Sequence, residues 1–329
     1  MAGNTELPLR AFFSPSQAAA AANHNGKDQP AGFMGTLCGS SERRAAGPQS
    51  TLRPKPAKTD LSLLDLSPTL ITELAVLGLC TGFLAGLLGL GGGMMLVPFL
   101  TIILASRGYP EAHTVKMAVA TSLATICFTS LSSVRAHHQR GAVLWPIALV
   151  LAPGIVIGSF AGSQLAAALP ARWLGLLFAA FVAFSATQML LNKKPKASRT
   201  LPGSVGMFGV GNLIGALSAM VGAGGAFISV PFMTWCNVSI HRAVGTSSAL
   251  GFPIALAGTA GYLLAGWNLP DMPPGAFGYL YLPGLLVLSV ASVLTAPLGA
   301  RLAHSMDIAP LKRAFALVLY CLAAYFVLR

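Results

Sequence analysis

The chain contains 329 residues, of which 54% are hydrophobic and only 9% are charged, with a formal net charge of +12. A typical soluble domain carries about 25% charged residues, so this composition excludes a soluble globular protein. The apolar stretches are long enough to cross a bilayer and lack the alternation of a membrane β-barrel. The sequence therefore predicts an all-α polytopic membrane protein. Its basic residues are spread among the loops, which argues against a nucleic-acid partner.

Residues 1–68 differ in composition from the rest of the chain. They are rich in Ala, Ser, Gly, Pro and Gln and have no apolar period, so we expect a disordered N-terminal extension. No segment resembles the apolar core of a signal peptide. A start codon set too far upstream and an organelle transit peptide are the alternative explanations.

The remaining chain divides into apolar segments that predict helices. Ten are expected, at approximately 70–90, 94–106, 116–134, 143–168, 173–191, 203–222, 225–236, 243–266, 279–303 and 311–328. The second and seventh are too short to span the hydrocarbon core, and each follows a run of glycines. Whether each glycine run joins two helices or interrupts one is open at this stage, so we expect eight to ten transmembrane helices.

Two glycine-rich segments repeat in the same register. Gly89–Phe99 reads GLGGGMMLVPF and Gly222–Phe232 reads GAGGAFISVPF, so their Gly, Val, Pro and Phe positions coincide. The stretch Lys116–Ser122 likewise matches His241–Ser247, and both end in Thr-Ser. A glycine break at corresponding positions of two apolar halves is the best sequence indication of a transporter binding site.

The repeat divides the membrane region into two homologous halves. We assign repeat 1 to residues 69–192, a basic linker to 193–202 and repeat 2 to 203–329. If the short segments cross the membrane, each half has five crossings, the halves are inverted, and most basic loops gather on the side of the linker. That arrangement satisfies the positive-inside rule and places the linker in the cytoplasm.

The glycine breaks predict where a ligand binds. A helix that starts inside the membrane offers unpaired backbone N–H groups and a partial positive charge, which suits an oxyanion. We expect such ends from the two halves to converge near the centre, together with the Thr-Ser pairs. The alternative is that the glycines only let helices pack closely and that the hydroxyls bond to backbone carbonyls. The candidate substrate-binding residues are Gly91, Gly92, Gly93, Pro98, Thr121, Ser122, Gly224, Gly225, Pro231, Thr246 and Ser247.

Four basic residues are candidates for attracting the substrate or coupling to it. Lys116 and His241 precede the Thr-Ser pairs, Arg242 follows His241, and Arg301 lies near an expected helix end. Lys116, His241 and Arg242 are better explained as anchors at the membrane interface, and this is the interpretation that we favour.

Acidic and metal-binding side chains are sparse. Beyond position 74 the acidic residues are Glu111, Asp271 and Asp307, all in expected loops, so no buried carboxylate is available for coupling. The adjacent His137 and His138 point about 100° apart on a helix, and the five cysteines show no ligand spacing. We therefore expect no metal site and no cofactor. No nucleophile–base pair or HExxH motif lies in the spans, so we expect no enzymatic activity.

At these motifs the chain resembles the TauE/SafE family of membrane proteins. The resemblance rests on the GxGGGxxxxP run at 89–98, its weaker copy at 222–231 and the Thr-Ser motif after each, and it covers about residues 70–328. It implies an integral inner-membrane protein that moves small anions such as sulfite, sulfoacetate, related sulfonates or organic acids. Ala226 stands where the first half has Gly93, so the two sites need not be equal. The basic N-terminal extension departs from the family pattern.

The favoured function is a secondary transporter that exports a small anion by alternating access. The inside-negative membrane potential favours anion exit by about 2.3 kcal/mol per charge per 100 mV, so export does not require a carboxylate relay. A metal or cation permease that uses His137, His138, Met94 and Met95 is one alternative, and a non-transporting membrane assembly factor is another. We expect a multi-pass protein of the cell inner membrane, with a plastid membrane as the less favoured location. Its partners are then the small anion and the lipid bilayer, and the oligomeric state is open.

Overall fold

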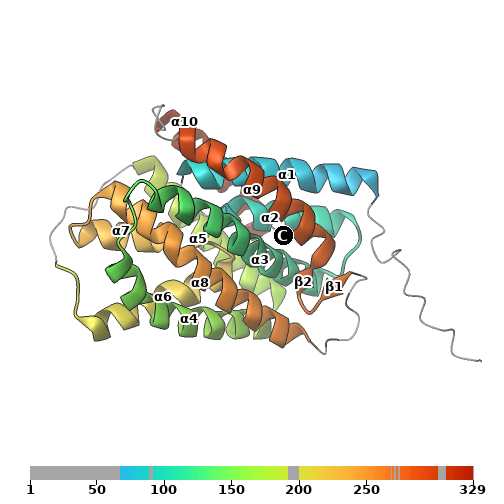
Figure 1. The fold of residues 1–329 in the computed structure, drawn as a ribbon. Coiled ribbons are helices and arrows are strands. Elements are labelled where there is room, and N and C mark those ends of the chain that lie inside the picture. The colour runs from blue at the N-terminus through green and yellow to red at the C-terminus, as the bar shows by residue number, and fades with distance from the viewer. Residues whose placement is uncertain are drawn as a thin grey trace, which may run out of the picture. The chain divides into compact units, whose positions relative to one another are not determined.

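The computed structural model describes residues 67–88, 92–191, 200–267, 269, 272, 275–302 and 309–328. The expected N-terminal extension up to residue 66, the candidate Gly91 and most of the basic linker (192–199) lie outside these ranges. The described chain forms ten helices and one short hairpin (Figure 1). In chain order these are α1 (Pro68–Leu88), α2 (Gly93–Ser106), α3 (Glu111–His138), α4 (Trp145–Ala168), α5 (Ala171–Leu191), α6 (Ser204–Val221), α7 (Ala226–Trp235), α8 (Ile240–Gly266), β1 (Ala276–Phe277), β2 (Leu280–Tyr281), α9 (Leu282–Leu302) and α10 (Ala309–Leu328).

The multi-pass helical character expected from the composition is confirmed. Within the described ranges, seven helices are long and apolar enough to cross a membrane, namely α1, α3, α4, α5, α6, α8 and α9. Helices α2 and α7 and the apolar stretch Arg313–Leu328 of α10 are shorter. Length and composition thus give seven spans, and the expected eight to ten are reached only by counting shorter helices.

Two features of the fold differ from the expectation. Helix α3 begins at Glu111 and ends at His138, so it extends beyond the predicted 116–134 at both ends. Glu111 therefore lies in the first helical turn, where its charge complements the helix dipole, and not in a loop. The antiparallel hairpin, in which Ala276 pairs with Tyr281 and Phe277 with Leu280, was not expected.

Each half of the chain packs its first helix against the fourth helix of the other half. Helix α1 lies along α9, and α6 lies along α4 (Figure 1). Helix α3 crosses α8, and α5 packs on α10, so corresponding helices of the two halves also meet. These four pairs of helices therefore join the two halves.

Glycines permit the close approach of the exchanged helices. A Cβ atom added at Gly158 of α4 would collide with the backbone oxygen of Asn212 on α6. A Cβ atom added at Gly82 of α1 would likewise collide with the backbone oxygen of Ser292 on α9. Backbone contact through small residues is how membrane helices associate, because lipid is as apolar as the side chains. These pairs are therefore held by close packing.

The surface of the bundle carries many large apolar side chains. Leu149, Leu213, Leu286 and Leu317 are each more than half exposed. In water such a surface would favour aggregation, whereas in a bilayer it contacts the lipid tails. The burial pattern thus agrees with a membrane-embedded bundle.

Candidate functional site

Helices α2 and α7 begin at glycines with left-handed backbone conformation. Gly92 is the N-cap of α2 with φ of 66°, and Gly225 is the N-cap of α7 with φ of 77°. Only glycine adopts this region at no steric cost. The first hydrogen bonds into α7 come from the N–H groups of Ile228 and Ser229 to Gly225 O. The N–H groups of the preceding helical residues have no acceptor within the helix, as at any helix start.

The start of α2 touches the end of α6 from the other half. Gly93 packs against the backbone oxygen of Gly222, where a Cβ atom would collide with it. Ser122 of α3 donates a hydrogen bond of 3.0 Å to the same oxygen. Gly222 is the C-cap of α6 with φ of 71°, so it too depends on being glycine. These contacts bring the first-half residues Gly93 and Ser122 against the second glycine segment.

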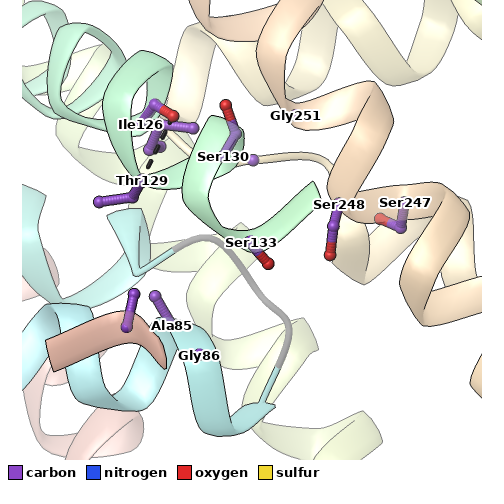
Figure 2. A pocket seen from close by; sticks show the side chains of 11 residues that line it. Ala85, Gly86, Ile126, Thr129, Ser130, Ser133, Ser247, Ser248 and Gly251 are labelled. Atoms are coloured by element: carbon purple, nitrogen blue, oxygen red, sulfur yellow. Dashed lines mark hydrogen bonds between the residues drawn. The ribbon is translucent and has the colours of Figure 1, made fainter. Parts of the chain in front are cut away.

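A small cavity with a mostly apolar wall and several hydroxyl groups lies beside this meeting point (Figure 2). Its empty space is about 370 Å³ when open solvent at its edge is included, and the centre of a water molecule can occupy only about 20 Å³ of it. None of its described lining residues is charged, and the polar groups on its wall are hydroxyls of α3 and α8 together with the backbone at Gly224. The lining residues are Ala85, Gly86, Ile126, Thr129, Ser130, Ser133, Gly224, Ser247, Ser248, Gly251 and Ala296.

The hydroxyls of the cavity bond to carbonyls of their own helices or to each other. Ser130 donates to Cys127 O at 3.1 Å, and Ser248 donates to Val244 O at 3.0 Å. Thr129 makes only long contacts, of 3.3 and 3.4 Å, to carbonyls of its own helix. Ser247 shares a 2.7 Å hydrogen bond with Ser229 of α7. Such local bonds leave the hydroxyl oxygens as acceptors, and rotation about χ1 can turn the donors toward a ligand.

The family of this chain follows from comparison with known proteins. The family model described as sulfite exporter TauE/SafE matches residues 74–326. The chain belongs to this family. This confirms the resemblance seen in the glycine and Thr-Ser motifs.

Relatives of the TauE/SafE chain carry transporter names. A "Probable membrane transporter protein" of Haemophilus influenzae is 34% identical over 257 residues, which is 78% of this chain and 97% of the relative. The "Probable membrane transporter protein YdhB" of Bacillus subtilis is 31% identical, over 56% of this chain and 76% of the relative. A "Probable membrane transporter protein" of Methanocaldococcus jannaschii is 26% identical, over 73% of this chain and 85% of the relative. No solved structure matches the chain significantly.

Only some of the predicted binding residues reach the cavity of this TauE/SafE protein. Gly224 and Ser247 line it, whereas Gly93 and Ser122 lie at Gly222 and are not among its lining residues. Gly92 and Gly225 cap their helices, Pro98 and Pro231 lie inside α2 and α7, and Gly91 is outside the described residues. The sequence did not single out Thr129, Ser130, Ser133, Ser248 and Gly251. A dense run of hydroxyls in the middle of an apolar helix was the available signal for the α3 residues.

Thr121 and Thr246 hold the two halves together. Thr121 Oγ1 accepts a hydrogen bond of 3.0 Å from the backbone N–H of Tyr281, just before α9. Thr246 Oγ1 accepts one of 2.9 Å from the N–H of Leu144, just before α4. Each threonine thus satisfies a donor at the start of the other half's fourth helix. Both were predicted to contact substrate, which stays a prediction; neither is a lining residue of the cavity.

Lys116 is buried within the protein and bonds to a backbone carbonyl, a contact that the sequence did not predict. Its side chain is buried, and Nζ donates a 2.6 Å hydrogen bond to Ala167 O in the last turn of α4. Nζ also lies 5.7 Å from the ring centroid of Tyr279. A cation at a helix C-terminus satisfies the free carbonyls and complements the dipole. Lys116 therefore caps α4 beneath the hairpin.

The other basic candidates are exposed. His241 and Arg242 lie at the start of α8, and Arg301 lies in the last turn of α9 as the sequence predicted. None of the three lines the cavity.

No metal cluster is found within the described ranges, where no group of three or more His, Cys, Asp or Glu side chains converges. His138 Nδ1 accepts a 3.2 Å hydrogen bond from Trp145 Nε1, and the two rings meet edge to face. Its imidazole thus takes part in packing between the end of α3 and the start of α4.

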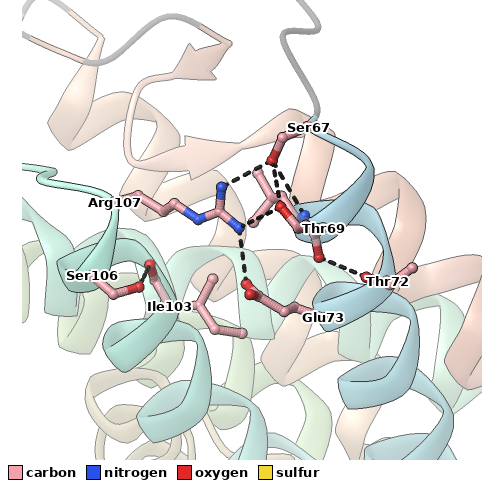
Figure 3. Close-up of polar contacts among 8 residues, drawn as sticks. Ser67, Thr69, Thr72, Glu73, Ile103, Ser106 and Arg107 are labelled. Atoms are coloured by element: carbon pink, nitrogen blue, oxygen red, sulfur yellow. Dashed lines mark hydrogen bonds and ion pairs between the residues drawn. The ribbon is translucent and has the colours of Figure 1, made fainter.

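The loop after α2 is fastened to the start of α1 by one arginine (Figure 3). Arg107 donates to Ser67 Oγ at 2.9 Å and to Thr69 Oγ1 at 3.3 Å, and it pairs with Glu73 at 3.2 Å. Nearby, Tyr109 meets Tyr281 edge to face. Burial raises the pKa of the Tyr281 phenol, which therefore stays neutral at physiological pH. This end of the molecule is closed by aromatic and polar contacts.

Proposed function

We propose that this protein is a secondary transporter that exports a small anion by alternating access. The observation that carries the proposal is the hydroxyl-lined cavity, which has no charged side chain among its described lining residues and lies where the two glycine segments meet. Neutral donors can bind an oxyanion without a counter-ion, and export along the membrane potential then requires no carboxylate relay. The substrate class implied by the family is sulfite, a sulfonate such as sulfoacetate, or an organic acid.

The proposal includes an inverted arrangement of the two halves in the cell inner membrane. The exchange of α1 with α9 and of α6 with α4 supports a two-fold relation, because corresponding helices make corresponding contacts. The basic ends of α3 and α8, with Arg135 and Arg242, would face the cytoplasm under the positive-inside rule. Ser133, a partly exposed residue of the cavity wall, is two residues from Arg135, so anions would enter the cavity from the cytoplasmic side.

Binding is the first test. Purified protein in detergent is heated in the presence of sulfite, sulfoacetate, sulfate, short carboxylates or zinc. A saturable rise in melting temperature with one of the anions supports the proposal. A rise in melting temperature with zinc alone favours metal transport. In that case anion flux is measured in proteoliposomes, and absence of anion flux refutes anion transport.

Gly251 allows the cavity to be blocked without straining the backbone. A Cβ atom there would lie 3.5 Å from Ser130 Cβ and 3.6 Å from Gly224 O, so alanine fits, whereas leucine would project into the cavity. Gly92 and Gly225 are poorer targets because any side chain at positive φ is strained. Gly251→Leu should reduce anion flux into proteoliposomes at least tenfold. The matched control Gly209→Leu, on α6 where nothing lies within 4 Å, should keep it. Normal flux by Gly251→Leu would exclude this cavity as the transport site.

A further inference from the structure

We propose that the cavity selects singly charged oxyanions over doubly charged ones, because every donor on its described wall is electrically neutral. The proposal rests on the proposed anion transport and adds a rule about the charge of the substrate. Within the proposed substrate class it favours monoanions, such as hydrogensulfite or a simple sulfonate, over dianions such as sulfoacetate. It also assigns this selectivity to three hydroxyl residues of α3 and two of α8. These are Thr129, Ser130, Ser133, Ser247 and Ser248.

The cavity offers several donors in a small space. Figure 2 shows Ser133 on α3 across from Ser248 on α8, and Ser130 and Ser247 are further lining residues from the same two helices. Gly251 and the backbone at Gly224 complete this part of the wall. The side chains of Thr129, Ser130, Ser247 and Ser248 are nearly or completely buried, so an ion held there leaves bulk water. Hydroxyl donors must then replace its hydration shell.

Basic side chains stand outside this space. Lys116 lies about 13 residues before Thr129 on the same helix, roughly 20 Å along its axis, and it is bonded to Ala167 O. Arg135 and Arg242 are exposed near the ends of α3 and α8 and are not lining residues. They can raise the local concentration of anions at the mouth without pairing with an ion inside.

Neutral donors favour low charge for a simple electrostatic reason. The cost of removing an ion from water grows with the square of its charge, and it is large in a medium of low dielectric constant. The attraction of fixed neutral dipoles grows only in proportion to that charge. Doubling the charge therefore quadruples the cost but only doubles the gain. A dianion would need a cation in the cavity, and the described wall supplies none.

A buried hydroxyl with no partner among the described residues lies close to the cavity, although it is not on its wall. Ser218 of α6 is fully buried, and within the described chain its Oγ has no hydrogen-bond partner. It lies against Gly225, where an added Cβ would be 3.2 Å from this oxygen, directly after the lining residue Gly224. A buried hydroxyl without a partner is costly, and such groups call for an explanation such as a bound ion or water.

The two halves also differ at the cavity. With the Thr-Ser motifs aligned, Thr129, Ser130 and Ser133 of α3 correspond to Ile254, Ala255 and Gly258 of α8. The second half thus forms the same crossing without these hydroxyls. The fold does not require them, and only one of the two repeat-related positions carries a polar wall. This indicates one site, with its hydroxyls supplied for binding.

The test compares two sulfur oxyanions that differ by one charge. Full-length protein in proteoliposomes is supplied with labelled methanesulfonate, a monoanion, or labelled sulfate, a dianion, with the membrane potential set to zero. Methanesulfonate flux should exceed sulfate flux at least tenfold. Equal flux, or faster sulfate flux, overturns the charge rule alone. Absence of flux for these and all other anions of the binding panel refutes the proposed transport and the charge rule with it.

A designed cation provides the decisive variant. Ser133→Lys places an ammonium at the cavity mouth and should lower the methanesulfonate-to-sulfate ratio at least tenfold by raising sulfate flux. Ser106→Lys adds the same charge at an exposed position outside the cavity and should leave the ratio unchanged. A folded Ser133→Lys protein with the wild-type ratio overturns the proposal. If that variant does not fold, the milder substitutions Ser130→Ala and Ser248→Ala test the role of the hydroxyls instead. Methanesulfonate flux should then fall at least fivefold. Unchanged flux overturns the assignment of the hydroxyls.

Discussion

Replacing Thr121 by valine should destabilise the protein through the contact between its halves. Valine keeps the shape of threonine but removes the oxygen that accepts the N–H of Tyr281 at 3.0 Å. Thr121 is completely buried and Tyr281 is 3% exposed, so water cannot readily replace the lost acceptor. The matched control is Thr101→Val on α2, which is equally buried but donates to Val97 O in its own helix.

The expected magnitude follows from the two kinds of hydrogen bond. An unsatisfied buried donor costs about 1–3 kcal/mol, whereas side-chain hydrogen bonds between membrane helices average about 0.6 kcal/mol. We therefore expect Thr121→Val to lower the free energy of unfolding by about 1–2 kcal/mol. Thr101→Val should change it by less than about 0.5 kcal/mol, because back-bonding within a helix adds little stability. Thr246→Val should fall between them, because its donor Leu144 is only partly buried.

The assay is unfolding of the purified protein in mixed micelles, followed by far-ultraviolet circular dichroism as the denaturing detergent is increased. The three valine variants are compared under identical conditions with the unmodified chain. Equal stability of Thr121→Val and Thr101→Val would refute the conclusion that the repeated threonines join the halves.

Three further predictions concern stability in the same assay. Gly158→Ala should lower the free energy of unfolding by about 1–3 kcal/mol, because the added Cβ atom would collide with Asn212 O. The control Gly209→Ala adds a methyl group in open space and should be neutral or slightly stabilising. Equal effects of the two substitutions would contradict the packing argument. Arg107→Gln should lower the free energy of unfolding by less than about 1 kcal/mol, because the Arg107–Glu73 ion pair is partly exposed. A larger loss would show that this ion pair makes a major contribution to stability. Burial raises the pKa of Tyr279 and of Tyr281 above that of the unfolded chain. The two phenols therefore ionise at lower pH in the unfolded chain than in the folded one, so the free energy of unfolding should fall as pH rises above about 10. In the double variant Tyr279→Phe/Tyr281→Phe it should fall less. An identical decline in the two proteins would contradict the assignment to these tyrosines.

The sequence was sufficient to predict the helices, because hydropathy is a local property. Each of the ten expected segments corresponds to a helix, and the hairpin at Ala276–Tyr281 was missed because two-residue strands carry no periodic signal. The pairing of α1 with α9 and of α6 with α4 could not be read from the sequence. It depends on contacts between residues far apart in the chain, such as Gly82 with Ser292.

The repeated motifs mark residues that make matching contacts, and they were a poorer guide to the cavity. The repeated Thr121 and Thr246 make matching contacts between the halves, so a structural role explains why both halves carry them. The hydroxyls of α3 that line the cavity have no counterpart in α8, and a search for repeats therefore passed over them. Among the repeated residues that the structure describes, only Gly224 and Ser247 are found on the cavity wall.

The exchange of helices between the halves restricts how the cavity can change its access. Helices α1 and α9 approach each other closely through backbone at Gly82, and α4 and α6 do so at Gly158, so we expect each pair to stay together. The cavity wall takes Ala85 from α1 and Ala296 from α9, and most of its hydroxyls from α3 and α8. If transport proceeds by alternating access, we therefore expect the helix pairs α1–α9 and α4–α6 to move as rigid bodies about the crossing of α3 and α8. The hydroxyls that would hold the anion lie at that crossing, where they can remain in contact with it while the mouth opens or closes.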